Sequence, residues 1–193
     1  LVRTSEGFVL LDTPWNDEQT EYLLDKIDSK FGSRVVLAII THLHDDRIGG
    51  IRTLIKRNIT AVSSALTAQF ATKAGFPSPK ILDKTDTTIR IGDNSFEVFY
   101  PGPGHSRDNI TVFVKNYNIL FAGCFLKSLS ANTIGNVSDA DVAAWPASVA
   151  KLSAKYPKAA IIVPGHGPEG DSKIYSHTTK IIDSYTKSQK KKK

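Results

Sequence analysis

The sequence predicts a mixed αβ fold in which helices lie on both sides of sheet material. Two patterns predict it: apolar strand-like runs alternate with segments of helical period in the first part of the 193-residue chain, and in the middle four short runs are separated by Gly, Asn and Pro turns. The composition, with 40% hydrophobic and 23% charged residues, is that of an ordinary globular domain. It excludes a disordered or collagen-like chain.

The first part of the chain reads as strands and helices in alternation. Residues 1–4 and 8–11 predict two strands joined by a turn. Asn16, followed three positions later by Gln19, predicts the start of a helix that ends at Gly32. The elements predicted after it are a strand buried on both faces at 35–40, a short helix from 51, a strand at 59–62 and a helix at 64–74.

The second part of the chain changes character. It holds a predicted meander or hairpin set with strands at 87–91, 95–100, 110–114 and 118–122, and a later buried strand at 159–163. Asp139 predicts the cap of a helix that carries Trp145, and a last helix holds Ile182. We therefore predict one domain over 1–186, followed by a lysine-rich, solvated tail at 187–193.

The formal charge of +6 suggests a nucleic-acid partner, but its distribution argues against one. Five of the 25 basic residues lie in the tail at 187–193, and no aromatic residue is interleaved with them. No run approaches the ~18 apolar residues of a membrane span, and no signal-peptide pattern is present. We expect a soluble protein without a nucleic-acid or membrane partner. The absence of methionine predicts that the beginning of the chain is missing.

Four apolar runs each end in a short loop that bears good metal ligands. The ligands are His42, His44 and Asp46 on the first loop, and His105, Cys124 and His166 on the other three. Strand ends are where αβ folds place their sites. Imidazole nitrogen, carboxylate oxygen and thiolate sulfur together suit zinc. Because six ligands exceed what one tetrahedral zinc uses, the sequence predicts two metals in one cleft.

Each ligand has an ordinary explanation when it is taken singly. A lone histidine on a loop is more often a surface residue, and a lone cysteine such as Cys124 is usually a small buried hydrophobe. The triplet His42-x-His44-x-Asp46 reverses that balance, because residues two apart in an extended segment project to the same side. His177 has no such neighbour in the last helix, so we predict for it a packing or surface role.

These loops resemble the two-zinc, broad-spectrum subclass of the metallo-β-lactamases. The resemblance runs from residue 1 to about 185 and rests on the segments THLHDDRIGG (41–50), GPGHSRDN (102–109), GCFLK (123–127), GNVSDAD (135–141) and PGHG (164–167). It implies a four-layer αββα sandwich with the site along one edge. It also implies about two further strands and a mobile hairpin before the equivalent of Leu1, which this chain lacks.

The resemblance assigns roles to the site residues. It gives His42, His44 and His105 to the first zinc, and Asp46, Cys124 and His166 to the second. Lys127 matches the lysine that pairs with the substrate carboxylate, and Asn136 matches the asparagine near the lactam carbonyl. The wider superfamily commonly has a histidine ligand and a bridging aspartate where this chain has Arg47 and Cys124, which favours lactamases over thioesterases and nucleases. We interpret Arg47 as a residue that orients or balances the ligands of the second zinc.

The resemblance implies a zinc-dependent enzyme that opens the β-lactam ring of penicillins, cephalosporins and carbapenems and confers antibiotic resistance. Zinc lowers the pKa of bound water toward ~7, so a zinc-bound hydroxide is available to attack the lactam carbonyl. Asp46 is expected to order this nucleophile or relay a proton, Asn136 to stabilise the oxyanion, and Lys127 to hold the substrate. We expect a periplasmic monomer.

Three alternatives remain open on the sequence. The first is a related metallohydrolase that acts on a thioester or lactone. The second is a domain that binds metal through intact ligands but does not turn over substrate. The third is a binding module whose lysine tail contacts DNA.

Overall fold

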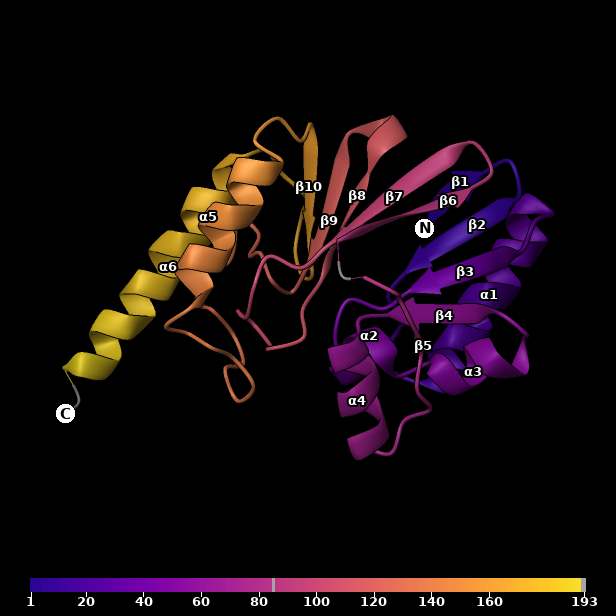
Figure 1. The fold of residues 1–193 in the computed structure, drawn as a ribbon, viewed down its shortest axis with the longest axis horizontal. Coiled ribbons are helices and arrows are strands. Elements are labelled where there is room, and N and C mark those ends of the chain that lie inside the picture. The colour runs from indigo at the N-terminus through magenta and orange to yellow at the C-terminus, as the bar shows by residue number, and fades with distance from the viewer. Residues whose placement is uncertain (85, 192–193) are drawn as a thin grey trace. The chain divides into compact units, whose positions relative to one another are not determined.

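The computed structural model describes residues 1–84 and 86–191, and its contacts divide the chain into two compact units, Leu1–Phe96 and Glu97–Lys193 (Figure 1). The strands are β1 (Val2–Thr4), β2 (Gly7–Leu11), β3 (Val35–Ile39), β4 (Thr60–Ser63), β5 (Lys80–Ile81), β6 (Thr87–Ile91), β7 (Asn94–Phe99), β8 (Thr111–Val114), β9 (Ile119–Gly123) and β10 (Ile161–Pro164). The helices are α1 (Asp17–Phe31), α2 (Asp45–Ile48), α3 (Ile51–Lys56), α4 (Ala65–Lys73), α5 (Trp145–Lys155) and α6 (Lys173–Lys190), with a 3₁₀ turn at Lys115–Tyr117.

The first unit is built on a sheet with the strand order β1-β2-β3-β4-β5. Strands β2 to β5 pair in parallel, because helices connect them, whereas β1 and β2 form an antiparallel hairpin. Leu24 and Ile27 of α1 and Ile51 and Leu54 of α3 pack in one core cluster with the sheet residue Ala38. The carboxyl ends of the parallel strands therefore meet at one edge of this sheet.

The local signals in the first unit are confirmed. The Asn16 side chain accepts a hydrogen bond from the backbone N–H of Gln19 at 2.9 Å and so caps α1. Gly32 ends the helix in the left-handed conformation, with φ of 59°. The continuous apolar run from Val35 forms β3, in which Ala38 and Ile39 are both completely buried. The structure adds the short elements α2 and β5, which the sequence did not predict.

The second sheet has the strand order β10-β9-β8-β7-β6. Strand β9 pairs in parallel with β10 and antiparallel with β8, so the sheet is mixed. Helices α5 and α6 lie side by side in the second unit (Figure 1), and the Tyr175 hydroxyl of α6 donates to the Tyr156 carbonyl at the end of α5. Trp145, Leu152 and Ile174 of these helices share a core with the β9 residue Leu120.

Two predictions for the second unit are wrong in detail. The helix predicted from Asp139 begins at Trp145, because the Asp141 carboxylate accepts from the Ala144 N–H and Pro146 stands in the first turn, where its missing N–H costs nothing. The last helix does not end before the lysines, since α6 continues to Lys190. The tail residues 192 and 193 lie outside the described residues, and the single domain over 1–186 stays a prediction.

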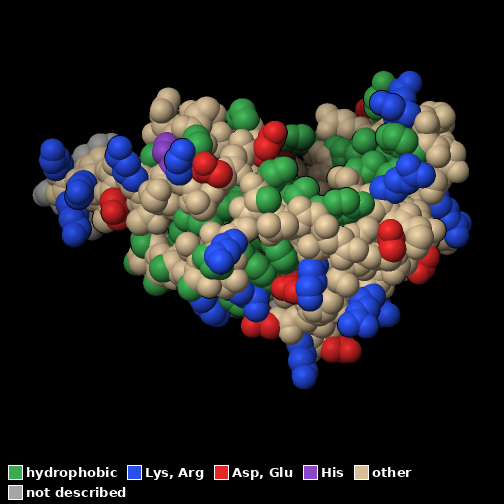
Figure 2. All heavy atoms as spheres, turned by 90° about the horizontal axis from the view of Figure 1, so that it is seen from above, with side chains coloured by type: hydrophobic (Ala, Val, Ile, Leu, Met, Phe, Trp, Pro, Cys, Tyr) green, Lys and Arg blue, Asp and Glu red, His purple; other side chains and the backbone are tan. Residues whose placement is uncertain are grey.

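The described part of the chain contains no helix that combines the length and apolarity of a membrane span. On the face drawn in Figure 2, Lys and Arg side chains are scattered among acidic, neutral and apolar ones, and several gather toward the α6 end. This distribution agrees with a body that is nearly neutral and a basic last helix.

Candidate metal centre

The loop after β3 brings three donor groups of the first unit together. His42 is 1% exposed, and its Nε2 lies 3.2 Å from Nδ1 of His44, with the two rings edge to face. One donor atom from each of His42, His44 and Asp46 lies within 4.8 Å of the others. The tight placement arises because the chain is extended through His44 and enters α2 at Asp45, which turns Asp46 back toward the imidazoles.

The buried carboxylate of Asp12 holds this loop in place through hydrogen bonds. Asp12 accepts from the Thr41 N–H at 2.6 Å and from the Thr41 hydroxyl at 2.8 Å. The Thr41 oxygen also lies 3.1 Å from Nδ1 of His42. Because the single hydroxyl proton goes to Asp12, this oxygen accepts from His42, which places the ring proton on Nδ1 and leaves the Nε2 lone pair for a metal.

Arg47 links Asp12 to the candidate ligand Asp46. Its guanidinium lies 2.9 Å from the Asp46 carboxylate and 3.6 Å from that of Asp12, with all three side chains nearly buried. Burial raises the pKa of Asp12 to about 7, and the Arg47 charge and the Thr41 donors oppose that rise. Arg47 therefore balances two buried carboxylates, and its role toward the ligands of a second zinc stays a prediction.

In the second unit, His105 stands on the loop between β7 and β8 and is buried. Asn109 braces this loop: its amide oxygen accepts from the Ser106 N–H at 3.1 Å, and its amide nitrogen donates to the Gly102 carbonyl at 2.9 Å. Gly104 is required because a Cβ there would lie 2.5 Å from the ring of Phe125. The His105 ring packs beside that of Trp145, with centroids 5.8 Å apart.

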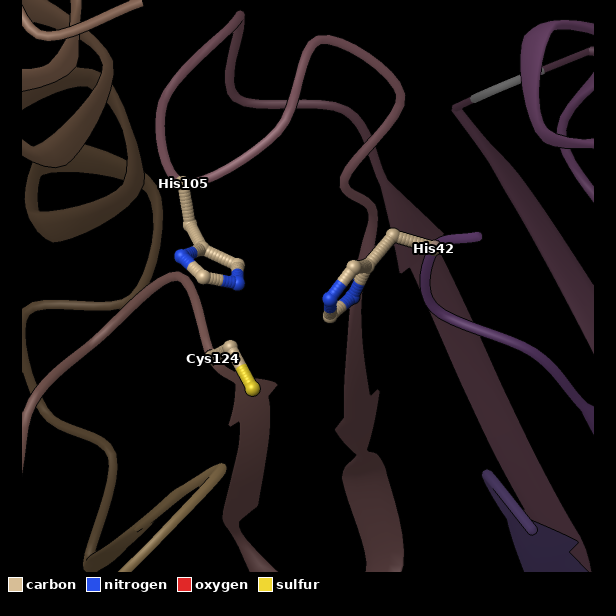
Figure 3. A group of neighbouring side chains, drawn as sticks. All are labelled: His42, His105 and Cys124. Atoms are coloured by element: carbon tan, nitrogen blue, oxygen red, sulfur yellow. The ribbon is translucent and has the colours of Figure 1, made fainter. Parts of the chain in front are cut away.

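Cys124 follows β9 and His166 follows β10, and these strands are parallel neighbours. Their donor atoms meet, with Sγ of Cys124 3.4 Å from Nε2 of His166. Gly165 permits this approach, because a Cβ at that position would lie 2.6 Å from the Cys124 sulfur. The side chains of Cys124 and His105 point into the same space (Figure 3), with donor atoms within 4.8 Å of one another. Figure 3 also labels His42, from the loop after β3.

The two residues predicted to bind substrate lie on the loop that connects β9 to α5. The Lys127 ammonium lies 5.4 Å from the centre of the Trp145 ring, and a Cβ at Gly135 would lie 3.7 Å from its Nζ. Asn136 is exposed, and its side-chain oxygen accepts from the Ser138 N–H at 3.0 Å. This bond commits the amide oxygen and makes the amide nitrogen the group suited to donate to a ligand.

The donor pairs fit zinc. Two nitrogens bound to one tetrahedral zinc at about 2.05 Å are about 3.3 Å apart, and a nitrogen and a thiolate sulfur are about 3.6 Å apart. The His42–His44 pair, at 3.2 Å, and the Cys124–His166 pair, at 3.4 Å, are close to these separations. A thiolate with imidazoles and a carboxylate is a donor set for a borderline cation rather than for magnesium or calcium.

Sequence reasoning gave no positioning role to three residues that hold the candidate ligands in place: Asp12, Asn109 and Trp145. Asp12 carries a detectable signal, since it follows a strand-like run and precedes a Thr-Pro turn, but nothing in the sequence pairs it with Thr41. His177 is half-buried, and its Nε2 lies 2.9 Å from the Ala131 carbonyl oxygen, so the packing role predicted for it includes a specific partner.

Comparison with known proteins agrees with this description. The model of the metallo-beta-lactamase superfamily matches residues 1–166. A metallo-beta-lactamase type 2 of Bacillus cereus is 42% identical over 182 residues, which cover 94% of this chain and 71% of the relative. One of Bacteroides fragilis is 39% identical over 191 residues, which cover 99% of this chain and 77% of the relative.

A metallo-beta-lactamase from Pontibacter korlensis has a similar solved structure, with a TM-score of 0.91 and 41% identity over 94% of this chain and 85% of that one. The chain therefore belongs to the metallo-β-lactamase superfamily and has its fold, with two mixed sheets and helices. It is a hydrolase whose family implies a metal, and the resemblance stated from the sequence is confirmed.

Proposed function

We propose that this protein is a zinc-dependent β-lactamase that hydrolyses penicillins, cephalosporins and carbapenems and confers antibiotic resistance. The contact between Cys124 and His166 carries the proposal, because a cysteine at this place favours the lactamases within the superfamily. Relatives that are 39–42% identical over nearly the whole chain are named metallo-beta-lactamases. That agreement supports the same activity here.

We propose two zinc ions per chain, with three protein donors each. His42, His44 and His105 hold the first ion, and Asp46, Cys124 and His166 hold the second. The separations between His42 and His44 and between Cys124 and His166 support these two pairs, and the Thr41 hydrogen bonds leave the Nε2 lone pair of His42 for a metal. The assignment of His105 and Asp46 rests on the resemblance.

Zinc supplies two kinds of chemistry when it is bound: it lowers the pKa of coordinated water to about 7, and it polarises a carbonyl oxygen. The residues of the chain organise that chemistry. Asp46, held by Arg47 at 2.9 Å, orders the nucleophile or relays its proton. The Asn136 amide donates to the developing oxyanion, and the Lys127 ammonium binds the carboxylate of the lactam nucleus.

The remaining features of the proposal concern location and partners. The curated relatives with this activity are bacterial, and we propose a periplasmic location and a monomeric enzyme. On the face drawn in Figure 2 the basic side chains are scattered among acidic and neutral ones, an arrangement that favours a small-molecule substrate over a nucleic acid.

Zinc titration followed by hydrolysis assays tests the proposal. The zinc-loaded protein is expected to bind two equivalents and to hydrolyse nitrocefin, a penicillin and a carbapenem, and EDTA is expected to abolish all three activities. Lys127→Ala should raise KM at least tenfold, because it removes an ion pair with the substrate, whereas Lys158→Ala, at an exposed lysine, should not. Nitrocefin turnover that EDTA leaves unchanged, or a preference for a thioester, would refute it.

A further inference from the structure

The start of the loop that carries Lys127 is held to α6 by two consecutive residues. The backbone N–H of Lys127 donates to the Thr178 hydroxyl oxygen at 2.9 Å, and that hydroxyl lies 3.5 Å from the Lys127 carbonyl oxygen. Four residues along the loop, the Ala131 carbonyl accepts from Nε2 of His177 at 2.9 Å. A carbonyl only accepts, so His177 carries its proton on Nε2 in this contact.

The Thr178 hydroxyl has a different kind of hydrogen-bond partner from other hydroxyls on the same helix. The hydroxyls of Thr179 and Thr186 donate hydrogen bonds to carbonyls one turn earlier in α6, at 3.2 and 3.0 Å, as Thr commonly does in a helix. Thr178, which is completely buried, bonds instead to the backbone of Lys127. This hydrogen bond therefore joins the helix to the loop and is not a hydrogen bond within α6.

Other contacts make the loop conformation depend on this tie. Ser128 and Ser130 share a hydrogen bond between their hydroxyls at 2.8 Å, and the Ala131 N–H donates to the Ser128 carbonyl at 2.9 Å, so residues 128–131 form one compact turn. A Cβ at Gly167 would lie 2.8 Å from Ser128, so the loop after His166 closes on the same turn. Fixing the turn at both ends fixes the point from which the Lys127 side chain starts.

The side chain of Lys127 is restricted as well. Its ammonium lies over the Trp145 ring, and Trp145 is itself fixed by a hydrogen bond from its indole N–H to the Phe125 carbonyl at 2.9 Å. A flexible lysine that is held at both its backbone and its ammonium loses little further freedom when it binds an anion. The two ties from α6 are thus placed to improve the affinity of Lys127 for a carboxylate.

We propose that His177 and Thr178 are positioning residues that set the affinity of Lys127 for the carboxylate of the substrate. The inference rests on the proposed function, in which Lys127 binds that carboxylate. It predicts an effect on KM with little effect on kcat, because an anion bound equally in the ground state and the transition state contributes uniform binding.

Two disruptive substitutions, two conservative substitutions and one control variant test the proposal. Thr178→Val and His177→Ala should each raise KM for a carboxylate-bearing chromogenic cephalosporin about threefold to tenfold, with kcat within about twofold. Thr178→Ser and His177→Gln, which keep a hydroxyl and an N–H donor, should restore KM to within about twofold. Thr179→Val is the matched control, because the Thr179 hydroxyl donates to the Tyr175 carbonyl within α6, and it should leave both parameters unchanged.

Two further measurements separate positioning from simple destabilisation. The KM increase should disappear when the methyl ester of the same cephalosporin is used, because it offers Lys127 no carboxylate, and it should disappear in a Lys127→Ala background. Amide exchange at 127–131 should be faster in Thr178→Val, with zinc stoichiometry unchanged. His177 is half-buried, so His177→Ala keeps the test valid if Thr178→Val does not fold.

The outcomes are distinguishable. Suppose that the wild type hydrolyses the cephalosporin. An unchanged KM in His177→Ala, or a KM increase that is equally large for the methyl ester, would then overturn this inference and leave the proposed function standing. A zinc-loaded wild type that turns over no β-lactam would overturn both.

Discussion

A methyl group at position 165 would lie 2.5 Å from the backbone nitrogen of Cys124 and 2.6 Å from its sulfur. Gly165→Ala must therefore displace Cys124 or the His166 that follows. We expect the affinity for zinc at these two ligands to fall about tenfold or more, because ligand placement controls affinity. A competition titration against a chromophoric chelator measures this, and loss of the thiolate-to-cobalt absorption in the cobalt-substituted protein identifies Cys124 as the displaced ligand.

Gly32→Ala supplies the control for that substitution. Gly32 also needs a conformation that suits glycine, with φ of 59°, but no atom lies within 4 Å of the added Cβ. Its replacement should lower the free energy of unfolding by about 1 kcal/mol while the zinc affinity stays at the wild-type value. Equal zinc affinity in the two alanine variants would contradict the steric role of Gly165.

The buried carboxylate of Asp12 predicts a pH dependence of stability in the metal-free protein. Burial raises its pKa from 3.8 to about 7, so between these values the folded protein holds a proton that the unfolded chain has released. Stability from this group is therefore present at low pH and is lost as the pH rises toward 7. Asn cannot titrate and tolerates the left-handed backbone of position 12, where φ is 62°.

The measurable quantity is the free energy of unfolding of wild type minus that of Asp12→Asn, obtained by urea denaturation in EDTA. It should fall between about pH 4.5 and pH 7.5, by at most about 1.4 kcal/mol per unit of pKa difference, and should level off above that range. A difference that stays constant across the range would show that Asp12 has an ordinary pKa in the folded protein.

The candidate ligands could be selected from the sequence, because a metal site needs several uncommon side chains and spacing places three of them together. His42, His44 and Asp46 stand two residues apart on a strand-ending loop, and this spacing survives into the structure. The residues that orient them were not predictable. Asp12 reaches Thr41 across 29 positions of sequence, and a lone aspartate gives no indication of such a partner.

At the level of elements, the loop between β7 and β8 depends on Asn109, whose side chain is 1% exposed. Asn109→Ala would leave the Ser106 N–H and the Gly102 carbonyl without this partner in a buried site. We expect the free energy of unfolding to fall by about 2–4 kcal/mol and the affinity for the zinc held by His105 to fall with it. Urea denaturation and zinc titration measure the two effects.

Asn118→Ala is the comparison variant for this loop. Asn118 also bonds through its amide nitrogen to a distant carbonyl, that of Lys158 at 3.0 Å, but it is exposed and lies at the opposite end of β9 from Cys124. Zinc affinity should be unchanged in this variant. If Asn109→Ala keeps full zinc affinity as well, the loop does not position His105 in the way that its hydrogen bonds indicate.

Elements with a local signal were predicted well, and those without one were not. The cap at Asn16 and the left-handed Gly32 are contacts within a few residues, and α1 lies where they predict it. The cap of α5 was misplaced by five residues, because Asp139 is a good cap residue but the cap lies at Ala144, whose N–H donates to the Asp141 carboxylate. The choice between the two depends on the Gly104 carbonyl, which accepts from the Asp141 N–H and is remote in sequence.

For the whole molecule, the mixed αβ fold followed from the order of the elements, but the pairing of strands did not. The parallel pair β9 and β10 is separated by about 40 residues that include α5, and only this pairing brings Cys124 to His166. Periodicity identifies each strand separately and carries no information about its neighbour. The resemblance assigned Cys124 and His166 to one zinc, which residue patterns could not do.

The proposed zinc ligands lie three in each compact unit, so zinc is expected to stabilise both units. At 100-fold excess over its dissociation constant, a ligand adds about 2.7 kcal/mol to the free energy of unfolding. For a chain of this size that corresponds to an increase of about 5–10 °C in the unfolding temperature. EDTA should remove the increase, and His42→Ala should reduce it, whereas Lys158→Ala should not.

The two tryptophans allow the units to be followed separately. Trp15 belongs to the first unit and Trp145 to the second, so in Trp15→Phe the fluorescence reports on the second unit alone, while amide exchange in β2 and β3 reports on the first. Zinc should raise the resistance of both units to unfolding, because a ligand that binds only the folded state stabilises every part that contributes a donor. If zinc stabilised one unit and left the other unchanged, the donors of the unchanged unit would not be zinc ligands, and the triplet at 42–46 or the Cys124–His166 pair would bind metal alone.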